Sequence, residues 1–250
     1  MNQKGRSIQY YIDKLDNDEP FTIARYGDGE WRTILGGKYR DGHNSNGCTF
    51  TKSLGKALGK AVRDQFTYDY GILRVARRNH RAEIERWLKR NHVITSWVDG
   101  DVILNSILSG TAFPLFERLR KKRVLMVCPE HCVPFSKLGF FSPVAYVVPP
   151  PRDAYDHRES VLSEVEYAIG KFNIDVIGWS SGLAAKHFIH EVYKVYGDMI
   201  SQIDFGSAWD GFFGVGSRSY VRRGKVLWKD LIDVNSGKRE KKENETFRKR

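Results

Sequence analysis

Residues 21–31 read FTIARYGDGEW, and this stretch decides how the rest of the chain is interpreted. Its first four residues form a short apolar run, which Gly27 interrupts soon afterwards. This pattern predicts a buried strand that ends at Arg25 in a loop. Helical periodicity follows from about Glu30. A buried strand, a glycine-containing loop and a helix in this order make the first half of a crossover unit, so we expect such units to repeat along the chain.

Outward from this stretch, strand-like apolar runs alternate with amphipathic segments as far as residue 205. We expect strands at 71–75, 93–96, 123–127, 145–148, 174–178 and 200–205, and helices at 8–15, 52–66, 80–90, 101–108, 113–119, 160–171 and 182–196. Crossovers of this kind join parallel strands. The sequence therefore predicts an α/β, Rossmann-like fold, with a largely parallel sheet and helices on both faces. Ligands of such sheets bind beyond the carboxyl ends of the strands.

The charge balance is strongly basic, with 41 Lys and Arg against 30 Asp and Glu and a net charge of +11. This excess favours polyanionic partners such as nucleic acid, anionic membranes or nucleotide phosphates. Basic clusters occur at 74–81, 120–123 and 222–225, and each by itself is typical of a solvated helix end. Residues 237–250 (GKREKKENETFRKR) are basic and poor in apolar residues. We expect one domain over residues 1–236 and a mobile basic tail over 237–250.

The chain contains no apolar run of the roughly 18 to 20 residues that a membrane span needs, and its first residues lack a signal core. We therefore expect a soluble protein of the cytoplasm. The three cysteines are an odd number without a CxxC pair, which is typical of a reducing compartment. Cys128, His131 and Cys132 lack a fourth ligand and the usual zinc spacing, so we do not expect zinc there.

The loop after the first strand carries two carboxylates, Asp28 and Glu30. We expect them to lie on a surface turn, where glycines at 27 and 29 permit the positive φ that a bend requires. The two carboxylates could then hold one hard divalent cation, Mn²⁺ or Mg²⁺, and leave positions open for a diphosphate. The alternative is structural, with Asp28 and Glu30 in the first turn of a capped helix.

A second loop, Ser180-Ser181-Gly182, joins a predicted strand to a long helix. Small residues at a helix N-terminus allow backbone N–H groups to approach a phosphate, and the helix dipole favours its negative charge. We expect a diphosphate site here, although an ordinary capped turn has the same composition. Two further loops, 149–158 and 204–213, mix acids with aromatic residues and are typical of a substrate-binding edge. They supply two candidates for a general base, Asp210 first and His157 second.

In their order along the chain, these segments resemble the GT-D family of glycosyltransferases, formerly a domain of unknown function, whose members carry R-[FY]-G-D-G-E after the first strand. The segment Arg25–Glu30 matches in full, and later landmarks recur at 153–155, 178–182 and 203–206. The resemblance covers about residues 6 to 215 and implies a metal-dependent enzyme that uses a nucleotide sugar, most simply a UDP-sugar. It assigns the metal to Asp28 and Glu30. Nucleotide contact falls to Arg25, Gly27, Ser180, Ser181 and Gly182.

The chain departs from the family pattern after residue 206, where relatives continue with histidine and acids, so the acceptor is open. The resemblance points to a glycan or glycoprotein of a bacterial surface. The positive charge, with Trp and Tyr interleaved near the proposed active edge, favours instead a hydroxymethylated pyrimidine in DNA, modified in a bacterial or phage-infected cell. A third hypothesis is a nucleic-acid-binding protein without catalytic activity, in which the DGE segment is only a turn.

Overall fold

The computed structural model describes residues 5–37, 48–217, 221 and 226–247. Seven short strands form a single sheet in the order β3-β2-β1-β7-β6-β4-β5, and every neighbouring pair is parallel. The strands are β1 (Thr22–Tyr26), β2 (Asp69–Ile72), β3 (Trp97–Asp99), β4 (Val124–Val127), β5 (Ala145–Val147), β6 (Val176–Trp179) and β7 (Ser201–Asp204). The α/β, Rossmann-like prediction is confirmed.

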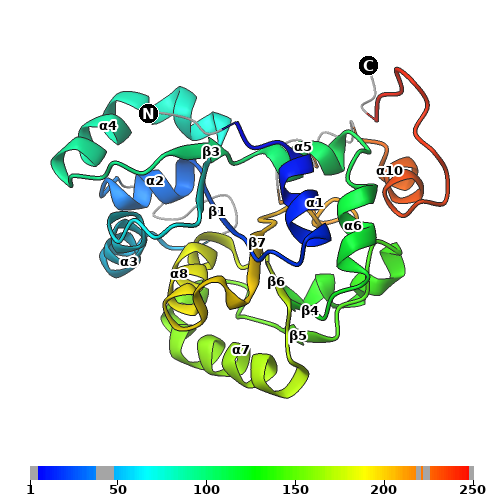
Figure 1. Ribbon diagram of the computed structural model, residues 1–250. Helices are drawn as coiled ribbons and strands as arrows, with labels where there is room; N and C mark the ends of the chain where they lie inside the picture. The colour runs from blue at the N-terminus through cyan, green and yellow to red at the C-terminus, as the bar shows by residue number, and fades with distance from the viewer. Residues whose placement is uncertain (1–4, 38–47, 218–220, 222–225, 248–250) are drawn as a thin grey trace.

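Helices cover both faces of the sheet (Figure 1). One face packs against α1 (Ile8–Asp16), α5 (Val102–Leu108), α6 (Phe113–Leu119) and the 3₁₀ segment η1 (Glu130–Leu138). The other packs against α2 (Asp28–Ile34), α3 (Lys52–Arg63), α4 (Arg74–Arg90), α7 (Arg158–Phe172) and α8 (Ala185–Tyr196). Short 3₁₀ turns are η2 (Ala154–His157), η3 (Gly182–Ala184) and η4 (Gly197–Met199).

Alternation of side chains along the strands builds the two cores. In β1, Ala24 and Tyr26 belong to the core on the α8 face, whereas Ile23 belongs to the core on the α1 face. All five residues of β1 are buried, which is why the strand appears in the sequence as an apolar run. The chain proceeds from β1 outward to β3 and then crosses to the other half of the sheet, so β1 and β7 meet at its centre.

Two predicted strand segments differ from the structure. Residues 74–75 begin helix α4 instead of ending β2, and the Arg74 N–H donates to Asp101 Oδ2 at 2.9 Å across the neighbouring loop. The run 93–96 is not a strand, because Ile94 is 90% exposed while Trp97 and Val98 are buried and pair with β2. An apolar run forms a strand here only where its side chains reach the core.

The C-terminal segment contains helix α10 (Trp228–Asn235), which the sequence analysis did not predict. Phe247 lies in the predicted tail, but it is only 2% exposed and packs in a small cluster with Val226, Leu231 and Val234. Its carbonyl oxygen also accepts from the Leu227 N–H at 2.9 Å. The basic segment is therefore anchored at residue 247, and the domain boundary at 236 stays a prediction. The basic cluster at 222–225 lies outside the described residues.

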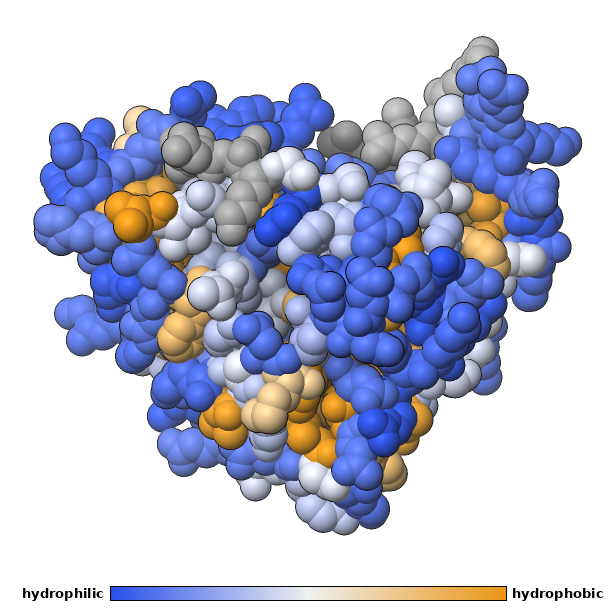
Figure 2. Space-filling view, viewed as in Figure 1, coloured by the Kyte–Doolittle hydropathy of each residue, from blue (hydrophilic) through white to orange (hydrophobic). Residues whose placement is uncertain are grey.

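The surface seen in Figure 2 is largely hydrophilic, including the part that covers α4, and its hydrophobic areas are interrupted by hydrophilic ones. Among the helices that the structure describes, none combines the length and the hydropathy that crossing a bilayer requires.

Candidate active site

A large open cleft of about 1520 Å³ lies at the carboxyl edge of the sheet. Residues that follow all seven strands line it, among them Gly27 after β1, Ser180 after β6 and Gly206 after β7. Because β1 and β7 meet at the centre of the sheet, the middle of this edge is the crevice in which open α/β sheets bind ligands. The cleft is therefore the candidate active site.

The cleft brings together most of the residues that the sequence singled out. Its lining includes both predicted metal ligands, every predicted nucleotide-contact residue and the first candidate base: Arg25, Gly27, Asp28, Glu30, Ser180, Ser181, Gly182 and Asp210. His157 is exposed at the end of η2 and does not belong to the lining. The two candidate bases are thus separated by the fold.

Asp28 and Glu30 occupy the first turn of α2 rather than a surface turn. Glu30 is 7% exposed, and its Oε2 accepts from the Gly27 N–H at 2.8 Å, which is one half of a capping box. The helix-cap alternative is therefore present in the structure. Gly27 has a φ of −93° and Gly29 lies inside α2 without a positive φ, so the expected positive φ is wrong for both. Close packing favours glycine at position 27 instead, because a Cβ would lie 2.8 Å from Leu73 Cδ1 and 3.1 Å from Glu30 Oε2.

A buried lysine, Lys186, connects the start of α2 with the end of the last strand, β7. Its ammonium lies 2.9 Å from Glu30 Oε1 and 3.0 Å from Asp204 Oδ2, and the lysine is 4% exposed. Burial alone lowers the pKa of Lys186, but the attraction of Asp204 and Glu30 outweighs it and the pKa is raised. Burial likewise acts to raise the pKa of Glu30, but Lys186 and two backbone hydrogen bonds hold that pKa below its ordinary value.

The sequence analysis assigned no role to Lys186 or Asp204. A signal for Lys186 is present, since the lysine stands among the apolar residues of the buried face of α8, where a charge requires a partner. Asp204 belongs to the segment 203–206 that carries the family resemblance. Neither signal identifies the partner, because β1 and β7 become neighbours only in the folded sheet.

The Arg25 guanidinium binds protein groups. Its Nε donates to Gly100 O at 2.6 Å and its Nη1 donates to Phe205 O at 2.8 Å, while Nη2 lies 3.7 Å from Asp101 Oδ1. Arg25 is 5% exposed, and from β1 its guanidinium ties together the loops that follow β3 and β7. The predicted contact of Arg25 with the nucleotide stays a prediction. Its observed role is to fix the backbone that lines the cleft.

The turn at Ser180–Gly182 leads into η3 and then into the twelve-residue helix α8. Ser180 and Ser181 are 7% and 9% exposed, and neither side-chain oxygen has a hydrogen-bond partner among the described residues. Gly182 has a φ of +63°, and a Cβ built there would meet no atom within 4 Å. Buried hydroxyls are normally hydrogen-bonded. The two serine hydroxyls lie beside open space at the start of a helix, so a ligand with acceptor oxygens, such as a phosphate, could bind there.

Asp210 lies in the cleft with partners on both carboxylate oxygens. His131 Nε2 is 3.1 Å from Oδ1, and the Ser217 hydroxyl donates to Oδ2. His131, Cys132 and Asp210 are also the one group of three potential metal-ligating side chains in the part of the chain that the structure covers. The aromatic neighbour Trp209 is fully buried in the core, so the expectation that tryptophan lines the active edge is wrong at this position.

Basic side chains stand on the rim of the cleft. Arg74 and Arg78 project from the first two turns of α4, and Arg152 lies in the loop after β5. All three are exposed, and within the described residues their guanidinium groups form no ion pair. The rim is therefore able to bind phosphate groups.

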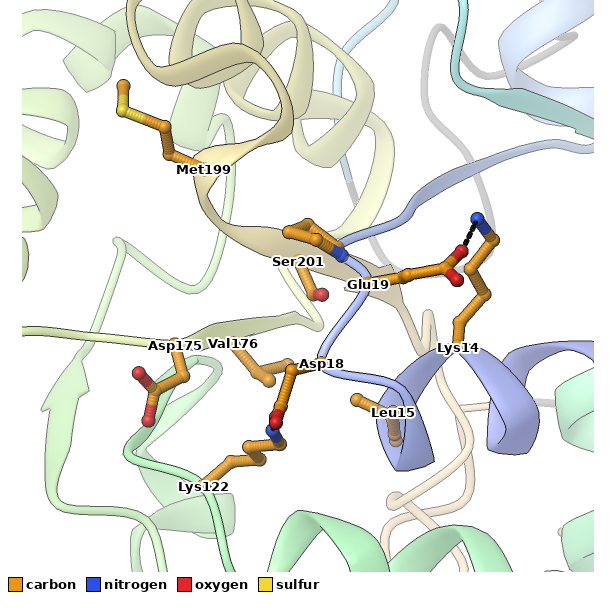
Figure 3. A pocket seen from close by; sticks show the side chains of 10 residues that line it. Lys14, Leu15, Asp18, Glu19, Lys122, Asp175, Val176, Met199 and Ser201 are labelled. Atoms are coloured by element: carbon orange, nitrogen blue, oxygen red, sulfur yellow. Dashed lines mark hydrogen bonds and ion pairs between the residues drawn. The ribbon is translucent and has the colours of Figure 1, made fainter.

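A second, much smaller pocket of about 180 Å³ lies at the amino ends of the strands (Figure 3). Lys14 pairs with Glu19 and Lys122 pairs with Asp18, so these charges in it are already neutralised. Ligands of parallel sheets bind at the opposite edge. This pocket is not a candidate active site.

The predicted metal site can be tested against the side chains at the start of α2. Asp28 is half-buried, lines the cleft, and makes no hydrogen bond or ion pair through its carboxylate within the described residues. Glu30 lies two residues further, with Lys186 and Gly27 already bound to its oxygens. Carboxylate oxygens suit Mn²⁺ and Mg²⁺. Asp28 is therefore an open candidate ligand, whereas both Glu30 oxygens are already engaged, and an ion shared by Asp28 and Glu30 stays a prediction.

No protein-family model and no curated protein sequence matches the chain. Two solved structures of domain of unknown function 1792 match it in fold, and one of them is described as having a distinct glycosyltransferase fold. Their TM-scores are 0.58 and 0.57 at 17% and 16% sequence identity, and each match covers 83% of this chain and 79% of the other. The resemblance to the GT-D fold is thereby confirmed at the level of the fold.

Proposed function

We propose that the protein is a glycosyltransferase that moves a sugar from a nucleotide-sugar donor, in the first instance a UDP-sugar, to an acceptor hydroxyl. One observation carries the proposal. The cleft at the carboxyl edge of a glycosyltransferase-type sheet contains both a turn with two buried hydroxyls, Ser180 and Ser181, and a carboxylate, Asp28, and none of the three has a side-chain partner among the described residues. A nucleoside diphosphate with a bound cation would satisfy both.

The donor diphosphate is assigned to the Ser180–Gly182 turn. Phosphate oxygens there would accept hydrogen bonds from the two hydroxyls, each of which costs about 1–3 kcal/mol when buried without a partner. The N-terminus of α8 adds the favourable end of a helix dipole. When the bond between the sugar and the diphosphate breaks, the same groups stabilise the negative charge that develops on the leaving group.

A divalent cation, Mn²⁺ or Mg²⁺, is assigned to Asp28 and Glu30. When bound, it supplies positive charge that neutralises the departing diphosphate. Lys186 also borders the cleft but is only 4% exposed, and its part is to fix the Glu30 carboxylate at the start of α2. Asp28 is then the side chain whose removal tests the cation most directly, because Glu30 also supports the fold.

For the acceptor we propose a hydroxymethylated pyrimidine in DNA. The support is the net charge of +11 and the exposed arginines on the rim of the cleft, Arg74, Arg78 and Arg152. Such side chains bind the phosphate backbone without sequence preference. A base turned out of the duplex would then enter the cleft. A bacterial glycan or glycoprotein is the other acceptor, which the following experiment distinguishes.

The test incubates the protein with Mn²⁺ and a panel of UDP-sugars and measures UDP release with three acceptors: plain DNA, 5-hydroxymethylpyrimidine DNA and a glycan mixture. We expect release, and a sugar-mass increment on the hydroxymethylated DNA. Asp28→Asn should abolish both, whereas Glu166→Gln, an exposed acid on α7, should change neither. Sugar on the glycan would replace the DNA acceptor, and no UDP release with any donor would refute the glycosyltransferase.

A further inference from the structure

His131 lies in the same cleft as the proposed donor site. It is the second residue of η1, directly beyond the end of β4, and its side chain is 31% exposed and lines the cleft. Its Nε2 is 3.1 Å from Asp210 Oδ1, although the two residues are 79 positions apart in the chain. The fold therefore builds a histidine–carboxylate pair that faces the space where an acceptor would enter.

The pair is held on both sides by the core. Trp209, next to Asp210, packs against Phe135 of η1 with ring centroids 4.7 Å apart and also against Phe205 at 4.7 Å. The Val215 N–H donates to the Asp210 carbonyl oxygen at 2.8 Å, which closes the loop beyond Asp210. Since η1 and the loop are fixed to each other by buried rings, the distance between His131 and Asp210 is set by packing.

The hydrogen bonds assign a role to each member of the pair. Both oxygens of Asp210 are engaged, one by His131 and one by the Ser217 hydroxyl, and the residue is 8% exposed. An ionised carboxylate only accepts hydrogen bonds, so His131 Nε2 carries the proton in this pair. The other ring nitrogen, Nδ1, then holds a free lone pair, and within the described residues nothing binds it.

We propose that His131, and not Asp210, is the general base of the reaction, and that Asp210 is its positioning residue. The inference rests on the proposed glycosyltransferase function. His131 Nδ1 takes the proton of the acceptor hydroxyl while the acceptor oxygen bonds to the anomeric carbon of the sugar. The bond from that carbon to the diphosphate oxygen breaks, and its electron pair leaves with the nucleoside diphosphate. The Asp210 carboxylate stabilises the imidazolium that results.

Zinc binding is the competing interpretation of the same cluster, because ligand atoms of His131, Cys132 and Asp210 all lie within 4.8 Å of one another. Zinc binds cysteine as the thiolate. Cys132 is fully buried, and a hydrogen bond with Cys128, together with burial, raises the pKa of its thiol. A thiol held neutral in this way is a poor zinc ligand, so the cluster is better described as a hydrogen-bonded pair beside a buried cysteine.

The experiment compares His131→Ala with His157→Ala, a histidine outside the cleft, in the presence and absence of added imidazole. We expect His131→Ala to lower kcat by about 10²-fold or more, with UDP affinity within twofold of wild type, because general-base catalysis contributes that much. Imidazole should restore part of the rate only in this variant. Asp210→Asn should lower kcat with unchanged UDP affinity, and Asp210→Glu should recover part of the loss.

Three results would overturn the proposal. One is a kcat within threefold of wild type in His131→Ala, and another is a loss of rate that imidazole does not relieve in a variant that still binds UDP. The third is stoichiometric zinc in the purified protein that disappears in His131→Ala. Wild-type protein that releases no UDP with any donor and acceptor refutes the underlying glycosyltransferase function instead, which separates the two failures.

Discussion

Replacing Lys186 by Met should destabilise the protein more than any change to an exposed ion pair. Lys186 is 4% exposed, and its ammonium lies within 3.0 Å of two carboxylates, one of which, Asp204, is fully buried. Methionine has a similar shape but no charge, so Glu30 and Asp204 would be left unpaired. Removing one partner from a buried ion pair costs about 3–5 kcal/mol. At about 2–4 °C per kcal/mol for a chain of this size, Tm should fall by about 6–20 °C.

The control is Lys194→Met on the same helix. Lys194 pairs with Glu191 at 2.7 Å, but its side chain is 43% exposed, so the change should stay within about 0.5 kcal/mol. Both free energies of unfolding come from urea titrations at pH 7. If Lys186→Met lowers the free energy of unfolding no more than Lys194→Met does, the buried ion pairs do not stabilise the fold. The role of Lys186 in fixing the Glu30 carboxylate is then wrong.

The pH dependence of this difference follows from the two pKa shifts. The pKa of Glu30 is lowered from 4.5, so its contribution is present above pH 4.5 and is lost as the pH falls through the lower, folded value. The pKa of Lys186 is raised from 10.5, so its contribution is present below that pH and is lost as the pH rises through the folded value. In Lys186→Met the ammonium that holds the Glu30 pKa down is gone, so burial acts to raise that pKa against the two backbone hydrogen bonds only. Protonation of Glu30 at low pH therefore relieves the unpaired charge in the variant and breaks the ion pair in the wild type. The difference in free energy of unfolding between wild type and Lys186→Met should narrow as the pH falls toward and below 4.5.

Three further predictions concern the donor turn, the basic rim and the C-terminal segment. Gly182→Val should weaken UDP binding about tenfold or more, equivalent to about 1.4 kcal/mol. The control Gly36→Val, also at positive φ with open space around it, should leave UDP binding unchanged. If calorimetry gives the two variants equal affinities for UDP, the Ser180–Gly182 turn has only a structural role. Arg78→Gln should reduce the slope of log K for DNA binding against log salt concentration by about 0.9. Arg86→Gln, near the other end of α4, should leave the slope unchanged. If a salt titration gives identical slopes for both variants, the arginines on the rim of the cleft do not bind DNA. Phe247→Ala should cost about 3 kcal/mol in urea unfolding, because it empties a buried site; an unchanged midpoint would mean that residues 237–250 are a mobile tail after all.

The sequence was sufficient for the fold class and for the position of the candidate cleft at the carboxyl edge of the sheet. The alternation of apolar runs with amphipathic segments is a local signal, and it predicted a parallel sheet because crossover helices leave few other arrangements. The loops that follow strands then had to lie at one edge, which is why Asp28, the Ser180–Gly182 turn and Asp210 could be assigned to one cleft. His157 failed to join them because it is the exposed last residue of the 3₁₀ turn η2 and does not line the cleft.

The partners of these residues were decided only by the tertiary structure. The Arg25 N–H donates to Asp204 Oδ2 at 2.9 Å across 179 positions of the chain, and His131 and Asp210 are 79 positions apart. Each pair meets because the sheet places β7 beside β1 and because buried aromatic rings hold η1 against the loop after β7. Periodicity reports which face of an element is buried, but it does not report which strand is its neighbour. Charge pairing, and with it the roles of Lys186 and His131, depends on that neighbour and so emerges only in the folded protein.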